Sequence, residues 1–109
     1  MPTSDPAPDP TAGRPPARPT VQVDNDVTRV TEWRFAPGAT TGPHRHEYDY
    51  VVVPMATGRL RIVTADGENI SELITGQAYH RPAGVEHEVF NANDGEFVFI
   101  EVELKDRCE

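Results

Sequence analysis

Three histidines have a spacing that suits binding of one metal ion. His44 and His46 are two residues apart, so on an extended strand both side chains leave the same face. At a rise of ~3.3 Å per residue their Cα atoms lie roughly 6.6 Å apart, which lets both rings reach one ion. His87 comes from a separate stretch, directly after a Pro-Ala-Gly turn at 82–84. Isolated histidines are more often surface groups or hydrogen-bonded core groups, so the prediction depends on all three converging.

We therefore predict one divalent transition metal held by His44, His46 and His87. Imidazole nitrogen suits Fe, Ni, Cu and Zn and, less strongly, Mn, so the sequence does not select the metal. Three neutral ligands leave the ion its full charge and at least one open coordination position. Such a site can take a bidentate anionic oxygen ligand, or dioxygen when the metal is redox-active.

Glycines and a proline frame these histidines in two stretches that resemble the two motifs of the cupin superfamily. The first stretch contributes Gly38, His44, His46 and Gly58. The second contributes Gly76, Pro82, Gly84, His87 and Asn91. The flanking segments 33–38 and 49–55 are similar to those of small single-domain cupins connected with β-alanine degradation. The resemblance covers roughly residues 20–105 and implies a conical jelly-roll barrel.

One position departs from the cupin pattern. The first motif of the family usually supplies a Glu ligand, separated from its second histidine by three or four residues. This chain has Tyr50 and Val51 at the corresponding positions after His46. In strict alternation Tyr50 shares the histidine face, whereas Asp49 points away. A β-bulge would turn Asp49 inward, because an extra residue reverses the facing of the chain. A three-histidine site completed by water or substrate is favoured, with Asp49 as the alternative fourth ligand.

Two further side chains are candidate catalytic residues. Tyr50 occupies the position of the usual Glu and is placed to reach the metal or to donate a hydrogen bond to a bound ligand. Arg81 precedes the Pro82 turn, and its planar guanidinium could clamp a substrate carboxylate. The more common roles are a core position for the tyrosine and a solvated one for the arginine. His80 lies outside both motifs and is expected at the surface.

Composition divides the chain at residue 19. Residues 1–19 hold seven of the eleven prolines and no Val, Ile, Leu or aromatic residue. Such a segment buries too little apolar surface to offset the entropy of ordering it, so a disordered Pro-rich tail is predicted at 1–19 and one barrel domain at 20–109. A tail that packs along a sheet edge or a partner subunit is the alternative.

The net charge of -8 belongs to residues 20–109, because the charges of the tail cancel. An acidic domain is a poor partner for nucleic acid and for anionic membranes, so a small-molecule ligand is expected instead. No apolar run reaches membrane-spanning length, and Cys108 as the only cysteine permits no internal disulfide. A cytoplasmic protein is predicted, and a homodimer is expected because a domain this small leaves apolar surface exposed as a monomer.

Short alternating segments between turn residues predict an all-β fold. Strands are expected at 27–35, 48–53, 59–64, 69–75, 78–81, 88–91 and 96–104. Asp66-Gly67 is a strong signal for a two-residue hairpin turn. In 96–104 Phe97 and Phe99 share a face with Glu101 and Glu103, and two aromatic residues on this otherwise acidic face suggest that another strand or subunit covers it. Residue patterns alone predict an antiparallel barrel or sandwich, and the resemblance selects the cupin jelly roll.

Two functions are compatible with these residues. The first is a metal-dependent enzyme, dioxygenase-like or lyase/isomerase-like, that acts on a small oxo-acid or carbonyl compound. The reaction types and the link to β-alanine breakdown are implied by the cupin resemblance. The alternative is a non-catalytic small-ligand binding or sensor domain whose metal is structural or absent. A purely structural dimer module is a third hypothesis, and it predicts a barrel interior filled by side chains.

Overall fold

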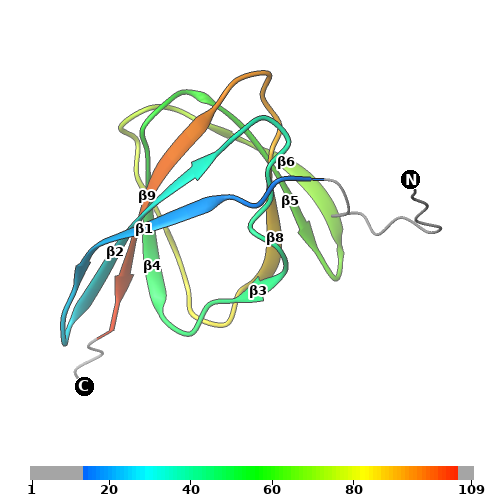
Figure 1. The fold of residues 1–109 in the computed structure, drawn as a ribbon. Helices are drawn as coiled ribbons and strands as arrows, with labels where there is room; N and C mark the ends of the chain where they lie inside the picture. The colour runs from blue at the N-terminus through cyan, green and yellow to red at the C-terminus, as the bar shows by residue number, and fades with distance from the viewer. Residues whose placement is uncertain (1–13, 106–109) are drawn as a thin grey trace, which may run out of the picture.

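The computed structural model describes residues 14–105, which form nine strands and no helix (Figure 1). The all-β prediction is therefore confirmed. The strands are β1 (Arg18–Asp24), β2 (Thr28–Phe35), β3 (His44–Arg45), β4 (Asp49–Pro54), β5 (Gly58–Thr64), β6 (Gly67–Leu73), β7 (Tyr79–Arg81), β8 (Glu86–Asn91) and β9 (Phe97–Leu104). No helix among these residues has the length and apolar character needed to cross a membrane.

Two antiparallel sheets build the barrel. One has the order β1-β2-β9-β4-β7 and the other β3-β8-β5-β6. In Figure 1 β4 and β9 lie on one side of the interior, and β5 and β8 lie on the other. The order interleaves strands distant in sequence, so β9 near the end of the chain lies between β2 and β4. This is the jelly-roll arrangement expected from the sequence.

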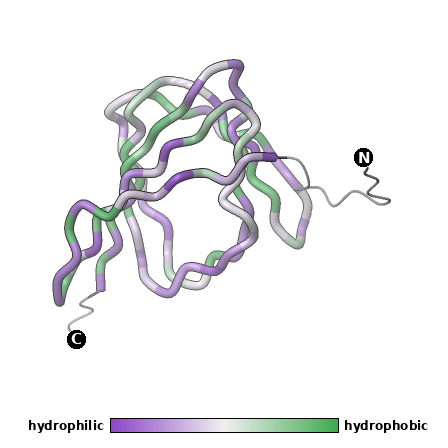
Figure 2. Tube along the Cα trace, in the orientation of Figure 1, coloured by the Kyte–Doolittle hydropathy of each residue, from purple (hydrophilic) through white to green (hydrophobic). Residues whose placement is uncertain are grey.

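The core forms where the inner faces of the two sheets meet. Phe35, Phe97 and Leu60 are among the most deeply buried side chains, and each comes from a strand whose hydropathy alternates with the pleat. Figure 2 shows this alternation as hydrophobic and hydrophilic residues succeeding each other along the chain. On β2 Thr31 and Phe35 are buried whereas Arg34 is exposed, as alternation along a strand requires.

The acidic face of β9 is the inward face. Phe97, Phe99 and Glu101 are all buried, with Glu101 only 7% exposed. Ile100 and Val102 on the opposite face are half-buried. The cover predicted for this face is supplied by the second sheet of the same barrel. A carboxylate is thus enclosed within the barrel, at a position to which the sequence pattern assigned no role.

Local details differ from the expectation at three places. Strand β1 was not predicted, because its residues are exposed throughout and carry no inward apolar face. The β5–β6 hairpin forms, but Thr64 pairs with Gly67, so the turn residues are 65–66 and lie one position earlier than predicted. Strand β3 is only two residues long, too short for any periodic pattern.

Residues 14–19 pack on the barrel, as in the alternative raised above for the tail. The amide of Ala17 donates to the carbonyl of Thr40 at 2.8 Å, and the amide of Thr40 donates to Pro15 at 3.0 Å. Ala17 is buried, and the guanidinium of Arg14 lies 5.2 Å from the centre of the Phe90 ring. The rest of the predicted tail, at 1–13, and Cys108 lie outside the described residues.

Replacing Gly58 with Ala should destabilise the barrel. A Cβ at this position would lie 2.7 Å from Oδ1 of Asn93 and 2.9 Å from Cε1 of Phe97. Asn93 cannot move aside freely, since its side chain bonds the amide and carbonyl of Arg59 at 2.9 Å each. We expect a loss of about 1–3 kcal/mol in unfolding free energy, the range for overpacking, measured by urea denaturation.

Gly95→Ala is the matched control, because a Cβ there meets no atom within 4 Å. It should change stability by less than about 0.5 kcal/mol. Equal effects of the two substitutions would show that the close approach at Gly58 does not matter.

Candidate metal centre

The pairing of β3 with β8 places two of the histidines opposite each other. His44 is the register partner of His87 in this antiparallel pair. His46 follows β3, and its backbone is fixed to the turn before β8. Its amide donates to the carbonyl of Val85 at 2.9 Å, and its carbonyl accepts from the amide of Gly84 at 2.8 Å. Gly84 has a φ of 95°, a conformation that strains any residue with a side chain.

The three rings converge through their Nε2 atoms. Nε2 of His46 lies 3.0 Å from Nε2 of His44 and 3.2 Å from Nε2 of His87. The three residues form a group whose ligand atoms all lie within 4.8 Å of one another. The three predicted ligands are thus brought together, and the rings meet at steep angles of 71–85°.

The oxygen atoms behind two of the rings indicate that this convergence suits a cation. Nδ1 of His44 lies 2.9 Å from the carbonyl oxygen of Gly42, and Nδ1 of His46 lies 3.2 Å from a carboxylate oxygen of Glu101. Carbonyl and carboxylate oxygens accept, so each Nδ1 carries the proton and each neutral ring directs its Nε2 lone pair at the other. Two lone pairs at 3.0 Å repel unless a cation lies between them.

The spacing also agrees with coordination geometry. Ligands ~2.1 Å from a metal are roughly 3.0 Å apart at right angles and roughly 3.4 Å apart at tetrahedral angles. The observed separations of 3.0 and 3.2 Å fall in this range. The donor set is therefore suited to a divalent transition metal on one face, with the remaining coordination positions left for other ligands.

Burial keeps two of these imidazoles neutral. It lowers the pKa of His46 to about 4, with a further contribution from His44. The pKa of His87 also falls to about 4, through burial and then the neighbouring charges of His44, His46 and Arg81. Neutral rings are what metal ligation requires, so near neutral pH these two ligands need not lose a proton first.

The stacked ring of Tyr50 holds His46 from one side. The two ring centroids are 3.9 Å apart with an angle of 20° between the planes. Tyr50 is buried, and burial is the main cause that raises the pKa of its phenol, so the hydroxyl stays protonated. The residue at the usual Glu position thus packs against a ligand ring, on the inward face expected from strand alternation.

Glu101 is the residue at this site that was not predicted from the sequence. Its Oε1 accepts from the indole Nε1 of Trp33 at 2.6 Å, and its Oε2 faces His46. Burial raises the pKa of Glu101 to about 7, against a lowering by the Trp33 hydrogen bond. The available signal was its position two residues after Phe99 on the same face of the strand, which predicts an inward direction.

Asp49 is not brought to the histidines. Its Oδ1 accepts from the amide of Ala83 at 2.8 Å, and its Oδ2 lies 3.5 Å from Nε2 of His80. Asp49 keeps regular register with Leu104 of β9, so no bulge turns it inward. Its carboxylate caps the turn that precedes β8. In this structure it does not supply the fourth ligand that the sequence left open as an alternative.

A cavity of about 270 Å³ opens beside the three histidines. Its walls are largely apolar, with Val52, Leu60, Val89 and Phe99 among them. Polar side chains also line it, namely Thr41, Thr64, Asn69, Ser71, Tyr50, Tyr79 and Arg81. The barrel interior is therefore hollow at the candidate metal, which contradicts the hypothesis of a purely structural module. A cavity of this size suits a small molecule.

The barrel and its three-histidine cluster define the class of protein. The family described as Cupin domain matches residues 31–103, so this chain belongs to the cupin family. The family resemblance identified in the two motifs is thereby confirmed.

Two individual relatives share high sequence identity with this chain. The chain is 60% identical over 94 residues to the Beta-alanine degradation protein BauB of Pseudomonas aeruginosa, covering 86% of this chain and 99% of that protein. A crystal structure of a cupin domain from Bordetella pertussis has 59% identity and a TM-score of 0.83, covering 84% of this chain and 96% of the other.

A more distant structure supports the architecture alone. The polyketide cyclase RemF from Streptomyces resistomycificus has 22% identity and a TM-score of 0.66, covering 91% of this chain and 74% of the other. At this identity the likeness shows a shared fold.

Glu101→Gln should change how the stability of the metal-free protein depends on pH. The pKa of Glu101 is about 7 in the folded protein against an ordinary value of 4.5, so folding strengthens proton binding. Its contribution to stability is complete below the unfolded pKa and is lost as pH rises through the folded pKa. Between these two pKa values the wild type should lose up to about 3 kcal/mol relative to the variant.

Urea unfolding in the presence of a chelator, at several pH values from 5 to 8, measures this difference. His46 and His87 act in the opposite direction, since their lowered pKa values make stability fall as pH decreases toward 4. They are present in both proteins, so comparing the two isolates the carboxylate. Parallel stability curves would contradict the assignment.

Proposed function

We propose that this cupin is a metal-dependent enzyme that acts on a small oxo-acid or carbonyl compound. The observation that carries the proposal is the convergence of three imidazole Nε2 atoms, 3.0 and 3.2 Å apart, at the wall of a cavity. A structural metal would need a closed ligand set, whereas three ligands leave open positions beside the hollow interior. A divalent metal bound here supplies Lewis acidity or, if redox-active, activation of dioxygen.

The charge of the site favours an anionic ligand. Among residues 14–105 no carboxylate belongs to the group formed by the three histidines, and Glu101 faces Nδ1 of His46 instead. The three ligand rings are neutral donors, so the ion would keep its full positive charge. A carboxylate or enolate oxygen is the complementary partner in an apolar cavity, where the attraction is weakly screened.

Two further residues are proposed to position the ligand. Arg81 lines the cavity and lies over the Tyr79 ring, with its guanidinium carbon 4.5 Å from the ring centre. Its planar fork is suited to a carboxylate of a ligand in the cavity. Tyr50 keeps its phenolic proton and can donate a hydrogen bond to a ligand oxygen.

The relative from Pseudomonas aeruginosa suggests a substrate class. Its name assigns it to β-alanine degradation, and this chain matches 99% of its length. We extend that name to a proposal that the substrate here is a small oxo-acid derived from β-alanine. The reaction type, dioxygenase-like or lyase/isomerase-like, stays a prediction.

A homodimer is also proposed. Ile100 and Val102 on the outer face of β9 are half-buried, and Leu104 is exposed. Apolar residues on an outer sheet face are the kind of surface that association between subunits buries.

Purified wild-type protein should contain one transition metal per chain, measured by elemental analysis. His44→Ala and His87→Ala should each reduce metal content to less than about a tenth, because removing one of three ligands weakens both affinity and geometry. His80→Ala is the matched control, since this histidine is 55% exposed and lies outside the cluster. A wild type without metal after expression in metal-replete medium would contradict the proposal.

Arg81→Gln should weaken binding of small oxo-acids by about 10-fold or more, the loss expected for one charge-assisted contact. The assay is ligand-induced stabilisation of the metal-loaded protein against a panel of oxo-acids, followed by oxygen uptake and product analysis. Arg45→Gln is the control, because Arg45 lies at the surface 3.7 Å from Glu86. Binding without turnover would favour the alternative, a small-ligand binding or sensor domain.

A further inference from the structure

Glu101 is a buried carboxylate that the proposed chemistry does not use. It is 7% exposed and lies on the inward face of β9 between Phe99 and Glu103. A buried carboxylate costs several kcal/mol unless its oxygens are hydrogen-bonded, so its partners are informative. Oε1 accepts a hydrogen bond from Nε1 of Trp33 at 2.6 Å, and Oε2 lies 3.2 Å from Nδ1 of His46.

The chemistry of the two neighbouring groups determines which atom carries the proton at each contact. The indole N–H of Trp33 can only donate, so Oε1 accepts. An ionised carboxylate has no proton to give, so in that state Nδ1 of His46 carries the proton that faces Oε2. The proton of His46 is thereby held on Nδ1, and the lone pair on Nε2 points at the other two rings.

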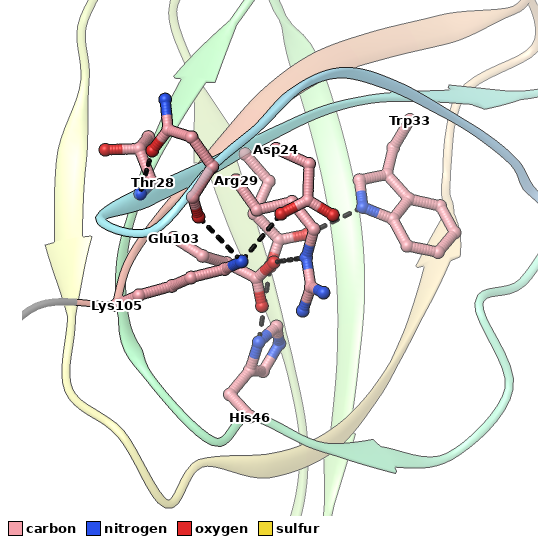
Figure 3. A network of polar contacts seen from close by, with 9 residues as sticks. Asp24, Thr28, Arg29, Trp33, His46, Glu103 and Lys105 are labelled. Atoms are coloured by element: carbon pink, nitrogen blue, oxygen red, sulfur yellow. Dashed lines mark hydrogen bonds and ion pairs between the residues drawn. The ribbon is translucent and has the colours of Figure 1, made fainter.

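Neighbouring side chains restrain Glu101 and the ring of His46. Figure 3 shows Trp33, His46 and Arg29 around two neighbouring carboxylates. Trp33 and His46 face Glu101, and Arg29 faces Glu103. Arg29 donates to Glu103 at 2.6 Å, so Glu103 is paired separately. Tyr50 stacks on the ring of His46 with centroids 3.9 Å apart. Tyr50 therefore restrains the plane of the His46 ring, and Glu101 faces its Nδ1.

We propose that Glu101, itself oriented by Trp33, is the positioning residue that keeps His46 in its metal-binding tautomer. The carboxylate acts through His46 and does not contact the metal position. The consequence for metal affinity rests on the metal centre proposed above. The effect on the tautomer does not, because it is a property of the metal-free protein.

Glu101→Gln tests the mechanism because the amide reverses one hydrogen bond. Gln offers one carbonyl oxygen and one NH2 group. Trp33 requires the oxygen, so the NH2 group faces Nδ1 of His46, which must then accept and move its proton to Nε2. That nitrogen can no longer bind a metal. We expect Co2+ affinity to fall by ~10–100-fold, the usual loss when such a supporting partner is removed.

A second substitution sharpens the test. Trp33→Phe in the Glu101→Gln background removes the indole N–H that would donate to the oxygen of the introduced amide. The oxygen can then turn to His46, and the Nδ1–H tautomer and part of the Co2+ affinity should return. A merely structural role for Glu101 predicts the opposite, because the double variant loses more packing and hydrogen bonding than the single one. Glu103→Gln is the matched control, since Glu103 pairs with Arg29. It should leave the His46 tautomer unchanged and the Co2+ affinity within about 2-fold of the wild type.

The readouts are the 15N chemical shifts of the His46 ring in metal-free protein at pH 8, where Glu101 is ionised, and Co2+ binding by calorimetry. A His46 protonated on Nε2 in the wild type would overturn the proposal before any variant is made. So would a Glu101→Gln variant that keeps the Nδ1–H tautomer. The third outcome is a wild type that binds no Co2+ but carries the His46 proton on Nδ1, together with a Glu101→Gln variant in which that proton moves to Nε2. This outcome would overturn the metal centre and support the positioning role.

Discussion

The mutual repulsion of imidazole lone pairs is the constraint around which this barrel is organised. Nε2 of His46 lies 3.0 Å from that of His44, although the Nδ1 hydrogen bonds leave no proton between them. In the absence of a cation, free rings would rotate apart. The backbone pairing of β3 with β8, the bonds of His46 to Gly84 and Val85, and the stacked Tyr50 ring oppose that rotation. The rest of the fold supplies the rigidity that makes this convergence possible.

The two sheets have different roles in this arrangement. The sheet β3-β8-β5-β6 carries two of the histidines, and the sheet containing β2, β4 and β9 carries the side chains that hold His46. Tyr50, Glu101 and Trp33 come from three adjacent strands of that second sheet, so their spacing is fixed by its ladder. The site therefore depends on the packing of one sheet on the other.

Much of this could be predicted from sequence because the signals are local. The strands β2, β4, β5 and β9 alternate clearly, and the motif histidines follow glycines and a proline whose turns are specified by a few residues. The edge strand β1 was missed because nothing in it is buried. The turn was predicted at 66–67 because Asp-Gly has a higher turn propensity than Ala-Asp. It lies at 65–66 because the pairing of β5 with β6 sets the register.

Glu101 was missed for a different reason. Its role depends on Trp33 and His46, which are 68 and 55 positions away in the sequence, and no local pattern encodes such a meeting. Alternation placed it on the face of Phe97 and Phe99, but an acidic residue on a strand is usually exposed. Only the interleaving of β9 between β2 and β4 reveals that this face is enclosed.

The position of this carboxylate matters for the electrostatics of the site. In the usual cupin pattern a Glu binds the metal directly and removes one unit of its charge. Here Tyr50 occupies that position, and a carboxylate lies behind a ligand ring instead. A carboxylate at this distance makes the imidazole a stronger donor without occupying a coordination position. A bound ion would then keep its open coordination positions and most of its charge for an anionic ligand, and the apolar cavity walls would strengthen that attraction. A carboxylate placed behind His46, in place of one bound to the metal, would therefore leave a bound divalent ion with one more unit of charge to attract an anion.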